Sequence, residues 1–187
     1  MLLNGRTIPL AGRLANSGAP LGEVFTFMSG LYFRGKLLYA EAFGAPPPGW
    51  PRAMVIAPGR GLVPADLLIR TPDLQAMGRV PVDHENPGFR DPLMRDARQL
   101  DRVLGSAGRA VLLGSVATDK YVAPLLQVFG ERLYFPAEFV GRGDMSRGGL
   151  LLRCVQARTP LECVPVRGAV RHGPKPPRLR RTLTEPK

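Results

Sequence analysis

The stretch RAVLLGSVATDKYVAPLLQVFGERLYF, residues 109–135, decides the predicted fold. Residues 109–114 and 131–135 are short apolar runs that predict strands, and apolar side chains between residues 121 and 129 recur at the spacing of one helix face. Pro124 fits only near the beginning of a helix, so the helix begins near residue 123 or is kinked. Strand, helix and strand in so few residues predict a right-handed βαβ crossover with two parallel strands.

Apolar periodicity and Gly/Pro punctuation predict further elements on both sides of this unit. The predicted helices cover residues 31–43, with Ser29 as the N-cap, and residues 91–104. Residues 70–93 show no clear periodicity. The predicted strands are a strand or hairpin at 7–14, strands at 23–28 and 52–57, and a β-hairpin made of 149–157 and 161–166.

These elements predict an α/β fold. We expect a single three-layer domain with a mainly parallel sheet and a C-terminal β-hairpin over residues 1–170, followed by a flexible basic tail over residues 171–187. A chain of 187 residues has the usual size of one domain and can hide roughly 70% of its unfolded surface. The Pro- and Arg-rich tail has no apolar face to bury, so we expect it to be disordered or to lie along the domain or a ligand.

The chain is strongly basic, with a formal net charge of +11 at pH 7. Residues 167–187 hold seven Lys and Arg residues against Glu185 alone, so more than half of the excess lies near the C-terminal end. A basic excess attracts polyanions by neutralising phosphates and releasing counterions, and it also serves simply as a solvated surface. The expected partner is nucleic acid or a phosphorylated small molecule.

No stretch of the sequence approaches the roughly 20 apolar residues that a membrane-spanning helix needs, and the N-terminal residues lack the apolar core of a signal peptide. We therefore expect a cytoplasmic protein with no membrane partner. Cys154 and Cys163 fall opposite each other in the predicted hairpin and are expected to be packed thiols in a reducing cytosol. No metal site or cofactor is predicted, because metal-ligand spacings and the standard nucleotide fingerprints GxxxxGK[ST] and GxGxxG are absent.

Four predicted strands are each followed by a loop with binding potential: 28–30, 58–61, 114–120 and 136–149. In parallel α/β sheets, ligands bind outside the carboxyl ends of the strands, where such loops meet helix N-termini. If the strands share one sheet, the loops converge there. The predicted ligand-binding residues are Ser29, Gly30, Arg60, Gly61, Ser115, Lys120, Arg142 and Arg147.

The densest of these loops is VGRGDMSRGG, residues 140–149. Its glycines let backbone N–H groups approach a ligand, and its two arginines, Arg142 and Arg147, can hold a phosphate or carboxylate in a bidentate manner. Asp144 and Ser146 are the candidate catalytic residues, because they can orient a nucleophile or a water molecule. The alternative is a mobile, Gly-rich connection in which they only cap the turn.

Residues 29–43 and 55–66 carry a resemblance to known proteins. A helix that begins at a serine, an apolar strand and a GLVPxD turn resemble a group of uncharacterised bacterial and phage α/β domains. The strand and turn are also similar to a domain attached to archaeal enzymes of the archaeosine tRNA-modification pathway. The likeness covers roughly residues 25–70 and matches Ser29, Gly61, Pro64 and Asp66, with aspartate in place of the pattern's glutamate. The resemblance implies an association with nucleic acid or nucleotides.

Three hypotheses about function follow from these observations. The first is a nucleotide- or nucleic-acid-associated protein that holds phosphate in its strand-end Gly/Arg loops, with further backbone contacts from the basic tail. The second is an enzyme of hydrolase or glycosyl-transferring type acting on a small phosphorylated or nucleoside substrate, with Asp144 as the acid/base. The third is a protein-interaction module. The sequence leaves the oligomeric state open.

Overall fold

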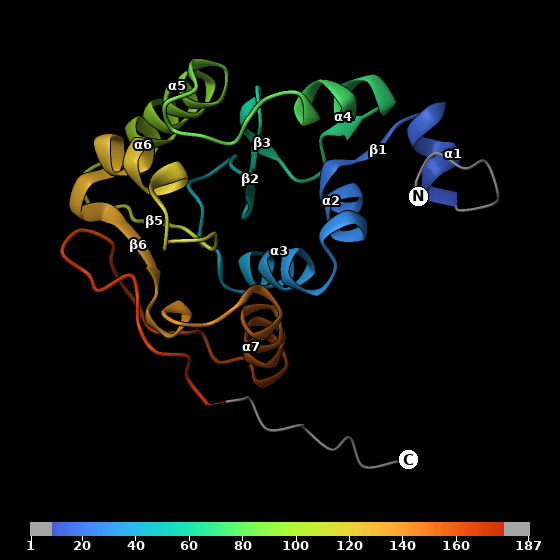
Figure 1. The fold of residues 1–187 in the computed structure, drawn as a ribbon. Helices are drawn as coiled ribbons and strands as arrows, with labels where there is room; N and C mark the ends of the chain where they lie inside the picture. Colours follow the sequence, from blue (N-terminus) through green and yellow to red (C-terminus); the bar gives the residue numbers. More distant parts are fainter. Residues whose placement is uncertain (1–8, 178–187) are drawn as a thin grey trace, which may run out of the picture.

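The computed structural model describes residues 9–177 of the chain, and Figure 1 traces the elements. The helices are α1 Pro9–Ala15, α2 Leu21–Ser29, α3 Leu31–Phe43, α4 Thr71–Gly78, α5 Pro87–Leu104, α6 Asp119–Phe129 and α7 Asp144–Ala157. Short 3-10 turns lie at Gly130–Arg132 and Ala137–Phe139. The strands are β1 Ala19–Pro20, β2 Met54–Ala57, β3 Gly61–Pro64, β4 Leu68–Ile69, β5 Ala110–Val111, β6 Leu133–Pro136 and β7 Cys163–Pro165.

The predicted pair of parallel strands around α6 is confirmed. β5 and β6 are parallel neighbours, with Ala110 opposite Leu133, and α6 connects them. The helix begins at Asp119 rather than near residue 123, and it accommodates Pro124 in its second turn. Its apolar face is buried, as the spacing of the apolar residues predicted.

The other strands do not extend this pair into a mainly parallel sheet. Within residues 9–177 they form three small sheets, β1–β4, β2–β3 and β5–β6–β7, and every pairing except β5–β6 is antiparallel. The mixed α/β class is confirmed, whereas one mainly parallel sheet in three layers is not. The physical reason is local, because β2 turns straight into β3 without a crossover helix, with Gly59 and Gly61 at φ +73° and +85° in the turn.

Two predicted strands near the N-terminus are helices. Residues 9–15 form α1, and residues 23–28 lie inside α2, while residues 7 and 8 fall outside the described part. The first N–H groups of α2, those of Leu21 and Gly22, donate to backbone carbonyls of the loop that follows β3, at 2.8 Å each. Tertiary contacts therefore stabilise a helix whose short, aromatic sequence favours a strand.

The helix predicted over residues 31–43 is confirmed as α3, but its N-terminal residue differs from the prediction. Ser29 ends α2, and Gly30 takes the N-cap position of α3 at φ +61°. A left-handed backbone between two helices is a conformation that glycine adopts without steric cost. Ser29 is therefore not the N-cap.

The proline-rich region 70–93 contains one helix and the beginning of another. Pro72 and Pro87 lie in the first turns of α4 and α5, where the missing N–H costs nothing. The predicted helix over residues 91–104 is confirmed, and it begins four residues earlier, at Pro87. Its buried face carries Phe89, Leu93 and Ala97 at four-residue spacing.

The predicted hairpin of 149–157 with 161–166 is wrong. Residues 149–157 are the second half of α7, and β7 pairs antiparallel with β6 instead. The helix is not evident from residues 149–157 alone, because it begins five residues earlier at Asp144, inside the segment predicted as a Gly-rich loop. Cys154 and Cys163 are both free thiols, as predicted.

Glycines allow α7 to cross α3 in backbone contact. A Cβ added to Gly35 would lie 2.8 Å from the carbonyl oxygen of Gly148, and one added to Gly148 would lie 2.8 Å from the carbonyl oxygen of Leu31. Any side chain at either position would push the helices apart. This crossing fixes the position of the first turn of α7 relative to α3.

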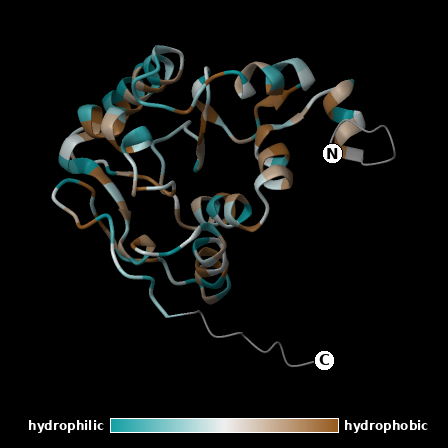
Figure 2. Cartoon of the chain, in the orientation of Figure 1, coloured by the Kyte–Doolittle hydropathy of each residue, from teal (hydrophilic) through white to brown (hydrophobic). Residues whose placement is uncertain are grey.

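The β2–β3 hairpin separates two hydrophobic clusters. Val55 and Ala57 of β2 are buried in a cluster with residues of α1 and α2, whereas Ile56 packs against a second cluster that contains the β5–α6–β6 unit. Successive strand residues point to opposite faces, so one apolar run supplies both clusters. In Figures 1 and 2 the hairpin stands between α5 on one side and α2 and α4 on the other.

The first part of the predicted basic tail lies along the domain. Arg171 pairs with Asp119 at 2.9 Å and donates to the carbonyl oxygen of Val116. Further along, the backbone of Pro174 lies against Gly141. Residues 178–187 of the predicted flexible tail fall outside the described residues, so the prediction of flexibility stays a prediction.

Candidate functional site

A half-open cavity of about 910 Å³ borders the hydrophobic cluster on the β5–α6–β6 side. The wall is formed by α3 and the β2–β3 hairpin on one side and by β5 and α6 on the other, with the first turn of α7 at one end. The interior is lined by aliphatic and aromatic side chains, among them Phe43, Ile56, Leu104, Leu125 and Phe129. A molecule with a sizeable apolar part fits such a lining.

The charged residues of the wall are mostly cationic. Lys36, Arg52, Arg109 and Lys120 line the cavity, and Asp144 is the one carboxylate among the described lining residues. In the part of the chain that the structure describes, none of the four cations forms an ion pair. The wall therefore carries four cations against one carboxylate, and this positive excess favours an anionic ligand.

Lys36 projects from α3 over two aromatic rings. Its Nζ lies 4.5 Å from the centroid of the Tyr32 ring and 5.0 Å from that of Phe33. Burial lowers the pKa of Lys36, because the charged form loses solvation; Asp144 opposes this effect, and the positive charge of Arg147 adds to it. Lys36 is thus a half-buried amine in the cavity wall.

Lys120 reaches the cavity from the first turn of α6. Its Nζ lies 5.0 Å from the centroid of the Tyr121 ring. The neighbouring acid, Asp119, is paired with Arg171, so it does not neutralise the lysine. Thr118 stands at the N-cap position of α6, but its side chain makes no capping hydrogen bond. A lysine at a helix N-terminus is a favourable place for an anion.

Tyr32 ties α3 to the loop that follows β5. Its buried hydroxyl donates to the carbonyl oxygen of Leu113 at 3.0 Å. Burial raises the pKa of Tyr32 to about 12, and the positive charge of Arg147 acts in the opposite direction. Burial and, to a smaller extent, Asp144 also raise the pKa of Tyr121. Both phenols stay protonated at neutral pH and can donate hydrogen bonds.

The structure brings together four of the predicted site residues. Ser29, Ser115, Lys120 and Asp144 all line the cavity. The side chain of Asp144 is 71% exposed and lies 3.6 Å from the guanidinium of Arg147, so it stands at the mouth rather than in the interior. It lacks the burial that commonly adapts a carboxyl to acid–base catalysis.

The other residues predicted from the 140–149 loop are engaged within the protein. Arg147 is buried and donates from Nε and Nη2 to the carbonyl oxygen of Phe139. Arg142 donates to the carbonyl oxygen of Glu138 and, at 3.3 Å, to the hydroxyl of Ser146. None of Arg142, Ser146 and Arg147 is among the residues that line the cavity. Their contacts hold the first turn of α7 against the preceding 3-10 turn.

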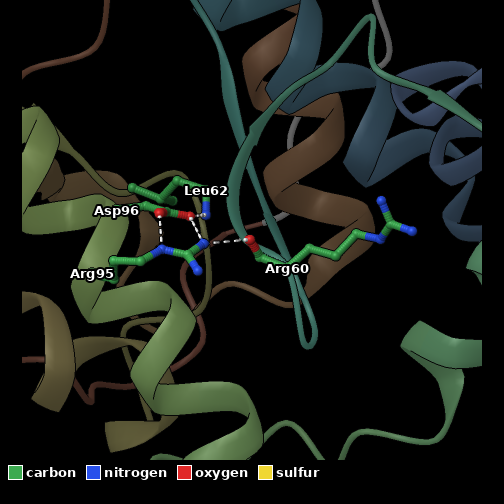
Figure 3. Close-up of polar contacts among 4 residues, drawn as sticks. All are labelled: Arg60, Leu62, Arg95 and Asp96. Atoms are coloured by element: carbon green, nitrogen blue, oxygen red, sulfur yellow. Dashed lines mark hydrogen bonds and ion pairs between the residues drawn. The ribbon is translucent and has the colours of Figure 1, made fainter.

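The 58–61 loop is also engaged in packing. Figure 3 shows Asp96 of α5 accepting from the backbone N–H of Leu62 at 3.0 Å, while Arg95 binds Asp96 and reaches the carbonyl oxygen of Arg60. The guanidinium of Arg60 pairs with Asp73. A Cβ at Gly61 would lie 2.1 Å from Oδ2 of Asp96. Neither Arg60 nor Gly61 lines the cavity, and neither does Gly30.

The sequence analysis did not predict three of the cavity residues, Lys36, Tyr32 and Tyr121. They lie on helices, whereas the predicted site residues came from loops. The scarcity of lysine in the sequence could have pointed to Lys36 and Lys120. The chain holds 26 lysines and arginines, of which only four, at positions 36, 120, 175 and 187, are lysines. Two of these four line the cavity.

Searches for metal-binding and membrane-spanning features in the described part gave no candidate. Within residues 9–177 no three His, Cys, Asp or Glu side chains are grouped so that they could hold a metal ion. No helix in that range is long and apolar enough to cross a membrane. Comparisons with protein-family models, with curated proteins and with solved structures found no match to this chain.

Proposed function

We propose that the cavity binds a phosphorylated small molecule of nucleotide size, with the phosphate at Lys36 and Lys120 and the apolar part in the interior. The observation that carries the proposal is the combination of a cavity of about 910 Å³ with four cations that have no ion-pair partner among the described residues. Cavities of roughly 300–1,000 Å³ are typical of small-molecule sites. Because the volume matches a small molecule, we expect the cavity to prefer a mononucleotide to a nucleic-acid strand.

The phosphate is assigned to Lys36 and Lys120 because both amines line the cavity and neither makes an ion pair or hydrogen bond among the described residues, whereas Arg52 already donates to the carbonyl oxygens of Glu41 and Gly44. Their positive charge attracts the phosphate, and the hydroxyls of Ser29 and Ser115 are available as further donors. The predicted arginine clamp at residues 142 and 147 has no part in this proposal, since both guanidinium groups already bind backbone carbonyls.

Trp50 provides a direct test, because it is the one tryptophan of the chain and lines the cavity. We expect AMP and GMP to change its fluorescence in a saturable titration and adenosine to bind more weakly. The substitution Lys120→Met should weaken AMP binding about 10- to 100-fold, the usual cost of a lost charge-assisted hydrogen bond. The free energy of unfolding should change little.

The matched control is Lys175→Met, the same change at an exposed lysine outside the cavity wall. It should leave the affinity for AMP unchanged. The proposal is overturned if none of the phosphorylated ligands titrates Trp50, or if Lys175→Met weakens binding as much as Lys120→Met.

The enzyme hypothesis rests on one residue of the cavity, Asp144. Its carboxylate borders the cavity and faces the amine of Lys36 closely enough to oppose the lowering of the pKa of that lysine. We propose for Asp144 a role in orienting the amine or admitting ligand rather than hydrolysis. The exposure of its side chain argues against a buried general acid.

A further inference from the structure

The four cavity cations differ in what they can do besides attract an anion. Arginine stays protonated in proteins, whereas a lysine amine that loses its proton is a nucleophile. In a chain with 22 arginines and four lysines, the cavity wall holds two of those lysines. Lys36 lies over the Tyr32 and Phe33 rings in the cavity wall, so a residue that can become a nucleophile borders the space for a ligand.

Lys36 loses its proton more easily than an exposed lysine does, because of its surroundings. The amine is half buried and has no ion-pair partner among the described residues, and these two features outweigh the preference of the Tyr32 and Phe33 ring faces for the ammonium. Desolvation lowers its pKa. The charged groups that face it from α7 are Asp144, which favours the ammonium, and Arg147, which disfavours it. The Tyr32 phenol on the same helix stays neutral below pH 10 because burial raises its pKa.

We propose that Lys36 is a nucleophile that forms an imine with the carbonyl group of a phosphorylated aldehyde or ketone bound in the cavity, while Lys120 holds the phosphate. The proposal rests on the proposed function and narrows it, since a carbonyl group of the phosphorylated ligand lies at Lys36 and the phosphate is held by Lys120 alone. Lys120 is suited to the phosphate because it stands at the N-terminus of α6 beside an acid that Arg171 already neutralises.

The step balances without an oxidant or a reductant. The nitrogen lone pair of neutral Lys36 attacks the carbonyl carbon, the π electrons of the C=O bond move to oxygen, and a proton passes from nitrogen to that oxygen to give a carbinolamine. The C–O bond then breaks, oxygen leaves as water with the second nitrogen proton, and a C=N bond remains. The ammonium must first give up its proton, and a base of the solvent accepts it.

The test uses the full chain and pyridoxal 5′-phosphate as a phosphorylated aldehyde, with sodium borohydride to reduce any imine to a stable secondary amine. Mass spectrometry then locates the adduct among Lys36, Lys120, Lys175, Lys187 and the terminal amine. We expect one equivalent of adduct on Lys36. Pyridoxal without the phosphate should label Lys36 far less, because it lacks the contact with Lys120.

Two matched variants separate a nucleophile from a simple anion binder. Lys36→Arg keeps the positive charge but cannot form an imine, so the adduct should be lost without reappearing on Lys120 or Lys175, while the urea unfolding curve should match that of the wild type. Lys175→Arg makes the same change at an exposed lysine and should leave both the AMP titration and the Lys36 adduct intact.

The outcomes distinguish the two proposals. If AMP binds normally but the adduct spreads evenly over Lys36, Lys120 and Lys175, the imine proposal is overturned and the proposed function stands. If no phosphorylated ligand binds, both are overturned. If the folded Lys36→Arg variant loses the adduct while Lys175→Arg keeps it, the imine proposal is supported; if the adduct moves to Lys120 in Lys36→Arg, the imine proposal is overturned.

Discussion

Two loops that both combine glycine with a basic residue differ in whether that residue is paired within the protein. The 58–61 loop and the 114–120 loop both follow a short apolar strand and both combine glycine with a basic residue. The charge of Arg60 is neutralised by Asp73, and its loop is bound to α5 through Asp96. Lys120 has no described ion-pair partner and faces a cavity. A glycine-and-cation loop therefore becomes a candidate site only when its charge is left unpaired beside an open space.

We expect the two loops to differ most in the free energy of unfolding that a Gly→Ala substitution costs. Gly61→Ala requires a Cβ 2.1 Å from Oδ2 of Asp96 and 2.6 Å from the carbonyl oxygen of Pro92, at φ +85°. We expect a loss of about 3–5 kcal/mol in the free energy of unfolding, measured by urea denaturation. At Gly114→Ala the nearest atom is a methyl group of Leu112 at 3.1 Å, which can move, so the loss should stay below about 1 kcal/mol.

Equal losses at the two glycines would contradict this view of the loops. They would mean that the 114–120 loop is packed as tightly as the 58–61 loop and has no freedom to admit a ligand.

The next effect concerns the hydrogen bond by which Tyr32 of α3 holds Leu113, the residue just before the 114–120 loop. Tyr32 has a pKa of about 12 in the folded protein and near 10 when unfolded, so its contribution to stability is fully present below pH 10 and is lost as the pH rises through 12. The contribution amounts to about 2–3 kcal/mol. Tyr32→Phe should lack this alkaline loss, as measured by urea unfolding at several pH values between 9 and 12.

Unfolding at pH 7 serves as the internal control for Tyr32→Phe. There the phenol is neutral in both states, and the variant should lose only the hydrogen bond to Leu113, about 1 kcal/mol. Identical alkaline slopes for the wild type and the variant would refute the assignment of this transition to Tyr32.

The smallest effect is expected at Arg60. Arg60→Met removes a partly exposed ion pair with Asp73, which is worth about 0–1 kcal/mol in similar settings. The affinity for AMP should not change, in contrast to the loss expected for Lys120→Met. Fluorescence titration of both variants under the same conditions makes the comparison, and equal weakening would show that the two loops act together.

The βαβ unit could be predicted because its signals are local. The apolar spacing from residue 121 to residue 129 and the short apolar runs at 109–114 and 131–135 are set by neighbours in the chain. The same is true of α3, of α5 and of β2. In each case the side chains that pack together already share one face of a helix or alternate along a strand.

Residues 23–28 and 149–157 were predicted as strands because the contacts that make them helical are distant. The first N–H groups of α2 bind carbonyls more than 40 positions along the chain, at Leu67 and Ala65. α7 crosses α3 at Gly148 and Gly35, and Gly148 lies in the segment whose sequence predicts a Gly-rich loop. Helix propensity is a weak signal that such tertiary contacts override.

The sequence by itself determined the charge of this protein, the scarcity of lysine and the loop residues Ser29, Ser115, Lys120 and Asp144 as candidates. Only the tertiary structure decided which candidates meet. The crossing of α3 and α7 brings Lys36 and Asp144 to the same cavity as Lys120, while Arg60, Arg142 and Arg147 are held by partners within the protein. A cation's availability depends on what lies within a few ångströms of it, and long-range packing sets that distance.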